Sequence, residues 1–451
     1  MSANKAVRNP LDLSMGRLKF AILGAGVSGL SAAVCLQKAG GHDVTIIERE
    51  PAPGGLCRSI QREGFTFDMT NHVLWQMDLK TKEFLSGLLG ADGLTWHDRR
   101  AFVYTHGGYT PYPFQAHLKH IDGQLTYECL REYLRRPITS GNFEEWSRAN
   151  FGDGIHRHFM RPFNEKLFGI PMSEIGTDWC NDVPIPDMDT VLRGATMDHH
   201  TELKSNSKFA YPTSGGMQSI VDALVCHLGQ SKLRLGRFVC QVDLRAKIVY
   251  HRDAAGKIEA TPYDVLLSTI PLVTLLSVAG ERGLASTMRS TIVVCVMLGF
   301  DRPLTTYRTG IDPIHWVYTP EAKYPFYRVT TNDSFCHSAV PSGCGNAMAE
   351  ITLGPDVTAS SETLVKQTLA GLEDMGLWRS SNNVRASNVE YLAPAYVIYD
   401  QARKNAQHRM EQMEEDSVFC FGRFGRWGYS SVCGDIADAR KTVDRILGAE
   451  C

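Results

Sequence analysis

The order of apolar and polar residues near the start of the chain predicts a strand, a helix and a second strand. Residues 18–23, LKFAIL, form an apolar run of strand length. Apolar positions with helical spacing follow through Leu36. The segment HDVTIIERE (42–50) then predicts a second strand, which ends at Glu48. This succession is typical of an α/β fold with a Rossmann-like unit.

A glycine-rich turn joins the first strand to the helix. Residues 24–29 read GAGVSG, the G-x-G-x-x-G pattern of dinucleotide sites. Gly24 permits the tight turn, Gly26 lets the backbone approach a pyrophosphate, and Gly29 allows close packing of helix on strand. The helix N-terminus stabilises the pyrophosphate. Glu48, 24 residues after Gly24, can accept hydrogen bonds from a ribose diol. We therefore predict a dinucleotide site, with a glycine-rich turn that binds no ligand as the alternative.

Two later segments repeat the strand-rich pattern. Residues 236–272 contain a strand, a hairpin and another strand that ends in STIPL. Near the C-terminus a strand runs into Gly422-Arg423 and a loop. An amphipathic helix then extends from about Asp435 to Leu447.

Length and composition set broad limits. A chain of 451 residues is too long for one compact core, which indicates two or three domains. Hydrophobic content of 43% and a net charge of −2 are ordinary for a globular protein and do not indicate a nucleic-acid partner. No apolar run reaches the roughly 18 residues of a membrane span. The N-terminal residues lack the apolar core of a secretory signal.

The cysteines and histidines do not indicate a metal centre. Twelve cysteines are scattered without a CxxC pair, which fits a reducing cytoplasm better than a disulfide framework. Two histidine pairs could be interpreted as metal ligands, but no cysteine or carboxylate cluster lies near them at the spacing of a metal site. The pairs are His156/His158 and His199/His200.

The segment EREPAPGGLCRS (48–59) distinguishes FAD from NAD, because a Gly-Gly turn follows the acidic strand end. It resembles the large family of FAD proteins that includes amine oxidases, protoporphyrinogen oxidases and sugar-nucleotide mutases. There the Gly-Gly turn packs on the FAD diphosphate, a later strand faces the adenine, and the last segment closes over the flavin. The resemblance implies an FAD site formed by Gly24, Gly26, Ser28, Gly29, Glu48, Gly54, Gly55, Leu56, His72, Val239, Gly422, Arg423 and Cys433.

The middle of the chain resembles the UDP-galactopyranose mutases, especially the longer fungal and protozoan type. GGYTPYPFQ (107–115) matches their uracil slot, where aromatic rings pack on the base and a glutamine reads its polar edge. WVYTPEAKYPFYRVT (316–330) matches the segment whose arginine holds the diphosphate through its planar fork. Taken alone, the first segment could be a loop that caps a core, and the second could carry a surface arginine. The implied substrate residues are Tyr112, Phe114, Gln115, Asn164, Phe168, Asn206, Tyr318, Arg328, Tyr396 and Tyr429.

The same resemblance implies a reaction. In the mutases, N5 of reduced FAD attacks the anomeric carbon of the UDP-sugar, UDP leaves, and the sugar recloses with the other ring size. The implied catalytic residues are His72, Arg328 and Arg423, and NAD(P)H is a candidate reductant. A cytoplasmic isomerase without nucleic-acid or membrane partners is expected. Whether the protein forms a homo-oligomer stays open. The alternatives are an FAD-dependent oxidase or dehydrogenase and a non-catalytic binding protein.

Three positions depart from the mutase pattern. The family's Gly-Gly-His-Val loop on the flavin reads Thr70-Asn71-His72-Val73 here. Asparagine tolerates unusual backbone angles better than most residues, although less well than glycine. Asp182 stands where the mutases carry a mobile-loop arginine, and an acid there would repel a diphosphate. Cys433 replaces an asparagine or aspartate beside the flavin.

The expected architecture has three parts. Residues 17–90, 205–275 and 415–451 would form a discontinuous Rossmann-like FAD-binding domain. Residues 116–204 would form a helical domain that carries the mobile loop. Residues 95–115 and 276–412 would form a twisted antiparallel sheet, and the active site would lie where the three parts meet.

Overall fold

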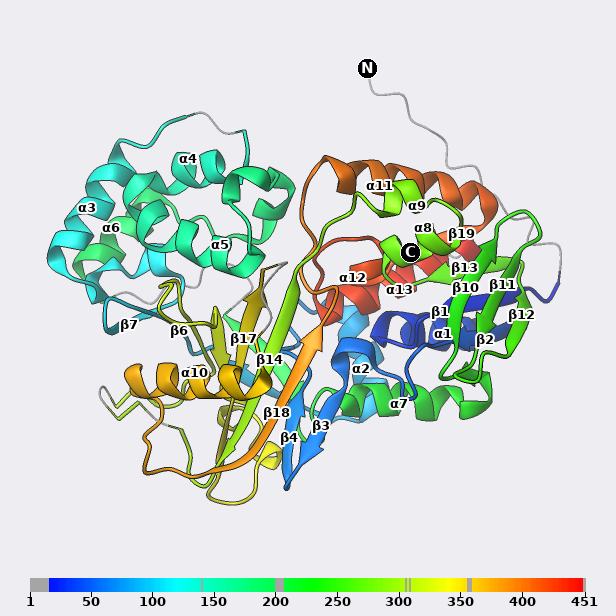
Figure 1. Ribbon diagram of the computed structural model, residues 1–451, viewed down its shortest axis with the longest axis horizontal. Helices are drawn as coiled ribbons and strands as arrows, with labels where there is room; N and C mark the ends of the chain where they lie inside the picture. The colour runs from blue at the N-terminus through cyan, green and yellow to red at the C-terminus, as the bar shows by residue number, and fades with distance from the viewer. Residues whose placement is uncertain are drawn as a thin grey trace.

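The computed structural model describes residues 16–138, 141–198, 207–304, 306–307, 310–354 and 359–448. A parallel sheet covered by helices occupies one side, while a group of helices and a larger sheet occupy the other (Figure 1). None of the described helices is long and apolar enough to cross a bilayer. The cysteines within the described ranges are free thiols.

The parallel sheet takes its strands from three separate parts of the sequence. Its strand order is β19-β13-β1-β2-β9. Phe20 and Ile22 of β1 face one hydrophobic cluster, and Ala21 and Leu23 face another. This alternation buries the sheet on both faces, as parallel sheets require. The strands are β1 (Lys19–Leu23), β2 (Asp43–Ile47), β9 (Leu233–Arg234), β13 (Val265–Ser268) and β19 (Val418–Cys420).

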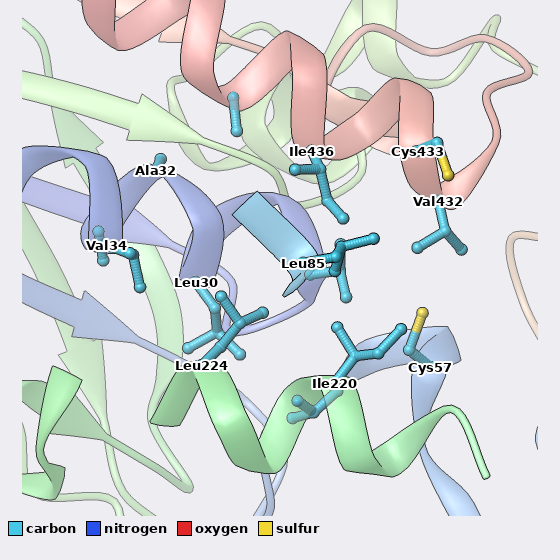
Figure 2. Packing of buried hydrophobic residues seen from close by; sticks show 14 of the residues in the cluster. Leu30, Ala32, Val34, Cys57, Leu85, Ile220, Leu224, Val432, Cys433 and Ile436 are labelled. Carbon is cyan, nitrogen blue, oxygen red and sulfur yellow. The ribbon is translucent and has the colours of Figure 1, made fainter. Parts of the chain in front are cut away.

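Four helices pack together on the first face of this sheet. Figure 2 shows Leu30, Leu85, Leu224 and Ile436, one from each helix, pointing into a shared core. A fully buried leucine stabilises the fold by about 1.5–3 kcal/mol relative to its exposed state. The helices are α1 (Val27–Ala39), α2 (Leu79–Leu89), α7 (Gln218–Leu228) and α13 (Val432–Leu447). Helix α13 begins three residues before the expected Asp435, because the Ser431 side chain caps it.

Helices also cover the second face of the parallel sheet. The domain boundaries expected from the sequence place most of these helices with the antiparallel sheet. Leu275, Ala285 and Ala406 pack in one cluster with Leu23 and Leu266 of the parallel sheet. These helices therefore belong with the dinucleotide-binding part of the molecule. They are α8 (Leu272–Val278), α9 (Arg282–Ala285) and α11 (Gln401–Gln412), which leads into η10 (Met413–Asp416).

The larger sheet has seven strands in the order β18-β14-β17-β16-β15-β6-β7. Strands β15 and β6 pair in parallel, so the sheet is mixed rather than purely antiparallel as expected. Val294 and Val296 of β14 face α10 (Ser361–Asp374), whereas Val293 and Cys295 face the helical region. The strands are β6 (Ala101–Thr105), β7 (Gly108–Pro111), β14 (Ile292–Phe300), β15 (Trp316–Tyr318), β16 (Arg328–Thr330), β17 (Gly345–Leu353) and β18 (Val384–Leu392).

The helical region packs against the face of this sheet that Val293 and Cys295 line, and it lies above the sheet in Figure 1. Gly152 bends α4 with φ of +74°, and a Cβ there would lie 2.4 Å from the Glu132 carbonyl oxygen. Glycine is therefore required where α4 crosses α3. The region contains α3 (Gly123–Leu134), α4 (Phe143–Ile155), the π-helical turn η4 (His156–Met160), α5 (Arg161–Phe168), η5 (Met172–Glu174), η6 (Thr177–Asp182) and α6 (Met188–Thr196).

Shorter elements connect these parts. A three-stranded antiparallel sheet follows α7, and β3 with β4 and β5 with β8 form two further antiparallel pairs. The strands are β3 (Ser59–Arg62), β4 (Phe65–Asp68), β5 (Leu94–Asp98), β8 (Lys208–Pro212), β10 (Phe238–Asp243), β11 (Ile248–Arg252) and β12 (Ile258–Pro262). The short helices are η1 (Gly55–Cys57), η2 (Phe114–Ala116), η3 (Leu118–His120), η7 (Gln230–Lys232), η8 (Asn332–Ser334), η9 (His337–Ala339) and α12 (Gly422–Gly425).

Candidate functional site

The turn between β1 and α1 needs its outer glycines. Gly24 has φ of +99°, and its N–H donates to the Ile47 carbonyl at 2.9 Å. A Cβ on Gly24 would lie 2.5 Å from Thr269 Oγ1. A Cβ on Gly29 would lie 2.1 Å from the Gly24 carbonyl oxygen. The turn can therefore bring α1 against β1 only with glycine at both positions.

The Gly-Gly turn and Glu48 lie beside this first turn. The Gly54 N–H donates to the Ala25 carbonyl at 2.8 Å. One Glu48 carboxylate oxygen accepts from the Ala25 N–H at 2.7 Å, and the other accepts from the Glu50 N–H at 2.8 Å. A Cβ on Gly55 would lie 3.4 Å from Gly26 Cα. The backbones of the two glycine turns thus pack closely against each other at the end of β2, next to the fixed Glu48 carboxylate.

The C-terminal segment completes the cradle. Gly422 has φ of +74°, and a Cβ there would lie 2.4 Å from Ser28 Oγ. Val239 is partly buried on β10, where it packs against the cluster on the second face of the sheet. Cys433 is 2% exposed and lies in the core of the first face (Figure 2). Burial raises the pKa of its thiol to about 12, so Cys433 is neutral at physiological pH.

These residues fit FAD. The cradle offers backbone N–H groups and a helix N-terminus to a diphosphate, and the carboxylate of Glu48 stands where a ribose is held. Beyond the cradle, three buried polar atoms have no hydrogen-bond partner in the described structure. They are Asn71 Oδ1, Arg423 Nε and Asp435 Oδ1. Buried polar atoms are normally satisfied, so they indicate that a polar group completes this region.

A cavity with two lobes extends from the end of the cradle. The first, the His72 lobe, begins at Leu56 and Arg423, which directly follow the cradle residues Gly55 and Gly422. The second, the Gln115 lobe, lies against η4, α5 and η6. Seven residues line both lobes and join them into one space. They are Trp75, Tyr112, Tyr318, Tyr327, Arg328, Tyr396 and Tyr429.

His72 lines its lobe as a neutral imidazole. Its Nδ1 lies 3.2 Å from the Leu56 carbonyl oxygen. Burial, and then the nearby Arg423 guanidinium, lower the pKa of His72 to about 4. A carbonyl only accepts, so the neutral ring donates through Nδ1 and leaves Nε2 as an acceptor.

Arg328 is held by a fully buried carboxylate. Its guanidinium makes a two-pronged ion pair with Glu350, in which Nε donates to Oε2 and Nη2 donates to Oε1 at 2.8 Å. The Thr70 hydroxyl also donates to Glu350 Oε1. Burial opposes ionisation of Glu350, but the Arg328 charge outweighs it and lowers the pKa of that carboxyl. The pair therefore stays ionised, and the carboxylate fixes the arginine fork.

Two further arginines line the His72 lobe. The Arg423 guanidinium lies 4.8 Å from the Tyr429 ring and 5.3 Å from the Tyr396 ring. Arg99 lies 4.9 Å from the ring of Tyr112. No carboxylate lines this lobe among the described residues. The arginines make the lobe electropositive, although Glu350 offsets the charge of Arg328 and the buried Asp435 carboxyl interacts with that of Arg423.

The Gln115 lobe combines aromatic walls with unpaired polar atoms. The rings of Tyr112 and Tyr318 lie 5.0 Å apart. The Gln115 Nε2 group donates to the Pro184 carbonyl at 2.7 Å, which fixes the amide orientation. Its Oε1 and the Trp179 Nε1 are both buried and have no partner among the described residues. The lobe thus offers one acceptor and one donor beside two tilted aromatic rings.

The structure brings most, but not all, of the expected substrate residues to the cavity. Asn164 lines the Gln115 lobe, and its Nδ2 donates to the Met160 carbonyl at 2.6 Å. Phe114 is fully buried and stacks on Phe159, so it supports the slot from behind rather than facing it. Phe168 is likewise buried, edge-on to Trp179. Asn206 lies outside the described residues, as does the side chain of Asp182.

Sequence reasoning missed several lining residues because their positions depend on tertiary contacts. Arg99 reaches the cavity because it precedes β6, which pairs with β15. Trp179 is brought in by η6. Glu350 becomes important only through its register opposite Arg328 in the sheet. No local pattern marks these side chains.

The chain is similar to flavoenzymes over most of its length. The family model described as flavin containing amine oxidoreductase matches residues 27–383. A crystal structure of reduced UDP-galactopyranose mutase is 26% identical, has a TM-score of 0.87, and the match covers 96% of this chain and 94% of that one. A putative protoporphyrinogen oxidase from Exiguobacterium sp. 255-15 is 15% identical, with a TM-score of 0.73 and coverage of 95% and 98%. Putrescine oxidase bound to putrescine is 16% identical, with a TM-score of 0.64 and coverage of 96% and 99%.

The similarity to curated proteins is local. The 4,4'-diapophytoene desaturases of Staphylococcus aureus are 40% identical over 62 residues. That stretch is 14% of this chain and spans 12% of the length of those relatives.

Proposed function

The chain belongs to the flavin containing amine oxidoreductase family, and within it we propose that this protein is an FAD-dependent mutase that interconverts the pyranose and furanose rings of a UDP-linked sugar. The observation that carries the proposal is the charge of the His72 lobe. Three arginines and no carboxylate line it among the described residues. Such a lobe attracts a diphosphate and repels the ammonium group of an amine.

The Gln115 lobe supports a pyrimidine base as the other end of the substrate. Uracil presents an N–H group between two carbonyl oxygens. Gln115 Oε1 is an unpaired acceptor for the N–H group, and Trp179 Nε1 is an unpaired donor for a carbonyl. The ring of Tyr112 provides a face on which a base can stack. The likeness to reduced UDP-galactopyranose mutase is in line with this substrate class.

The residues of the chain bind and orient the reactants. Bound reduced FAD supplies a nucleophilic nitrogen for the anomeric carbon of the sugar. Arg328, held by Glu350, and Arg423 stabilise the diphosphate as it departs from the sugar. The Tyr318, Tyr396 and Tyr429 side chains line the same space and are the candidate tyrosine ligands of the phosphate oxygens.

His72 contributes as a neutral group. Its pKa of about 4 leaves the imidazole uncharged throughout the physiological range. A neutral ring adds no positive charge that would compete with the arginines for the diphosphate. Its Nε2 acceptor is available to a hydroxyl of the sugar or to an N–H group of the flavin.

An FAD-dependent oxidase or dehydrogenase is the second candidate. Asn71, Asp182 and Cys433 depart from the mutase pattern, and the local match to curated proteins is to the 4,4'-diapophytoene desaturases. Such an enzyme would take a hydride from an amine or a C–H donor.

Ligand binding separates the two candidates. The oxidised and reduced holoenzyme would be titrated with UDP and, separately, with putrescine, while the flavin absorbance is recorded. We expect UDP to bind and to perturb the flavin spectrum, and putrescine neither to bind nor to reduce the flavin. Flavin reduction by putrescine without UDP binding would overturn the mutase proposal and favour an amine oxidase.

A further inference from the structure

We propose that Lys166 is a positioning residue whose ammonium group orders the nucleotide-binding side chains Tyr318 and Arg328 by holding the segment that joins their strands. This segment, the 319–327 connection, runs from the end of β15 to the start of β16. The inference rests on the proposed function, because it takes Tyr318 and Arg328 as ligands of a nucleotide sugar. It adds a control by pH, through a lysine that lines neither of the two lobes.

One partly buried ammonium group bonds three carbonyl oxygens of the connection. Lys166 Nζ donates to the carbonyls of Thr319 at 2.8 Å, Glu321 at 2.6 Å and Phe326 at 3.0 Å. A protonated lysine has three N–H donors, so each donor has one acceptor. Because these carbonyls stand near both ends of the 319–327 connection, the ammonium group holds the two ends together.

The two ends of the connection lead directly into the cavity. Tyr318 precedes Thr319, and the two residues Tyr327 and Arg328 follow Phe326. The Thr319 N–H also donates to the Tyr327 carbonyl at 2.9 Å, and Tyr318 stands opposite Arg328 in the strand register. The length and geometry of a connection fix the register of the strands that it joins. An ordered connection therefore keeps both cavity side chains in place.

Helix α5 places Lys166 between two walls of the cavity. Asn164 on the same helix lines the Gln115 lobe. The Phe163 ring lies edge-on to the Tyr318 ring, with their centroids 5.3 Å apart. The bonds from Lys166 to the 319–327 connection therefore tie the helical wall of the base slot to the strand that carries Tyr318.

The charge that makes these bonds is lost near neutral pH. Burial lowers the pKa of Lys166 to about 7, and the Glu321 carboxylate opposes only part of this shift. A deprotonated amine has two N–H groups and a lone pair, so it cannot serve three carbonyl oxygens. As the pH rises through 7, one carbonyl loses its donor and meets the lone pair. The 319–327 connection is then held less tightly, and the affinity for the nucleotide falls.

Glu321 is the charged group of the connection that acts on Lys166. Its carboxylate is fixed from the neighbouring strand, where it accepts from the Thr105 hydroxyl at 3.3 Å and from the His106 N–H. Lys323 Nζ lies 3.6 Å from the same carboxylate. These contacts keep Glu321 in place whether Lys166 is charged or neutral.

The other elements around α5 also carry charged groups. On α5 itself Arg161 pairs with Glu165 at 3.2 Å, and on the sheet Arg328 pairs with Glu350. Carboxyl and guanidinium groups ordinarily titrate far from neutral pH. Burial lowers the pKa of His158 on η4, so that ring is neutral above pH 7. The loss of charge between pH 7 and 8.5 is therefore assigned to the lysine.

The test measures binding of UDP-galactopyranose or UDP-glucose, whichever binds more tightly at pH 6.0, to the oxidised holoenzyme. Isothermal titration calorimetry at pH 6.0, 7.0, 8.0 and 8.5 gives the dissociation constants. Both phosphates of a sugar nucleotide are esterified, so the ligand does not titrate in this range, whereas a terminal phosphate such as that of UDP titrates near pH 6.

Three variants separate the charge from the fold. Lys166→Arg keeps a cationic donor that does not titrate, and Lys166→Met removes the donors. Lys166→Gln is the second neutral variant if Lys166→Met does not retain FAD. The matched control is Lys247→Met, which removes a partly buried lysine directly before β11 whose Nζ donates to the Asp264 carbonyl at 3.3 Å.

We expect wild type and Lys247→Met to bind the sugar nucleotide about tenfold or more weakly at pH 8.5 than at pH 6.0, because the competent fraction falls with the protonated fraction of Lys166. Lys166→Arg should bind with one affinity at all four pH values, and the neutral variants should bind weakly at all of them. A constant wild-type affinity, or a pH dependence that persists in the Lys166 variants, would overturn the role of Lys166 and leave the proposed function standing. Failure of wild type to bind either sugar nucleotide at pH 6.0 is a separate result, which overturns the proposed function and this inference with it.

Discussion

At the scale of single residues, the cavity combines a neutral histidine with arginines of two kinds. Arg328 is neutralised by a buried carboxylate that fixes its orientation. Arg423 is held by the carbonyl oxygens of Ser430 and Ala395, each at 3.2 Å, and its charge interacts with the buried carboxyl of Asp435, whose pKa burial raises to about 6. The first arrangement favours precise geometry, and the second favours anion binding.

Gln115 provides the sharpest test of the base slot. Gln115→Leu removes the unpaired acceptor and keeps most of the side-chain volume. A buried hydrogen bond to a ligand is worth about 1–3 kcal/mol, so UDP should bind about 10- to 100-fold more weakly. Isothermal titration calorimetry of the holoenzyme measures the change. The control is Gln124→Leu on the exposed start of α3. Equal UDP affinity of both variants would show that Gln115 does not contact the base.

His315 should make the stability of the protein depend on pH. It is 3% exposed, and burial lowers its pKa to about 4. Between pH 6.5 and 4 the unfolded chain binds a proton at this site and the folded chain does not. Its contribution to the free energy of unfolding therefore falls as the pH falls through this window.

The variant His315→Asn keeps an acceptor for the Arg100 N–H, which donates to His315 Nδ1 at 3.1 Å. Urea denaturation at pH 7.5, 5.5 and 4.5 should show a smaller loss of stability on acidification for this variant than for wild type. The matched control is His227→Asn at an exposed position on α7, which should behave like wild type. An identical pH dependence of His315→Asn and wild type would show that His315 does not titrate as described.

At the scale of elements, glycines decide how closely neighbouring segments approach. Gly422 starts α12 directly against Ser28 of α1. Its N–H also donates to Asp438 of α13 at 2.9 Å. One residue thus joins three helices at the FAD cradle.

Gly422→Ala should separate these helices. The new Cβ would lie 2.4 Å from Ser28 Oγ, and φ of +74° is unfavourable for alanine. We expect a loss of stability of about 1–3 kcal/mol together with a lower FAD content. Thermal denaturation and the ratio of flavin to protein absorbance measure the two effects. Gly283→Ala on α9, where a Cβ would meet nothing within 4 Å, should leave both unchanged. Full FAD content in Gly422→Ala would contradict the account of the cradle.

The sequence allowed the local elements to be predicted better than their tertiary partners. The strand, glycine turn, helix and acidic strand end of residues 18–48 lie as expected, because periodicity and glycine spacing encode them. The apolar faces of α8 and α11 show that these helices are packed, but not against which sheet. The parallel pairing of β15 with β6 likewise joins segments more than 200 residues apart, for which no short-range signal exists.

At the scale of the whole molecule, the cavity lies where three parts of the chain meet. The dinucleotide part contributes His72 and Arg423, the mixed sheet contributes Arg328 and Tyr318, and the helical region contributes Asn164. Family resemblance identified most of these residues. Phe114 and Phe168 are buried beside the cavity and do not line it, a distinction that the sequence does not show, because a buried aromatic residue and a ligand-stacking one look alike in a sequence.

The decisive measurement is ring interconversion by the reduced protein. The holoenzyme would be reduced with dithionite without oxygen and incubated with UDP-galactopyranose, UDP-glucose or UDP-N-acetylgalactosamine, with the oxidised holoenzyme as control. Chromatography then separates pyranose from furanose sugar nucleotides. We predict a furanose product from at least one of these substrates with the reduced protein and none with the oxidised protein. Absence of product from all three with the reduced protein would contradict the assignment as a UDP-sugar mutase.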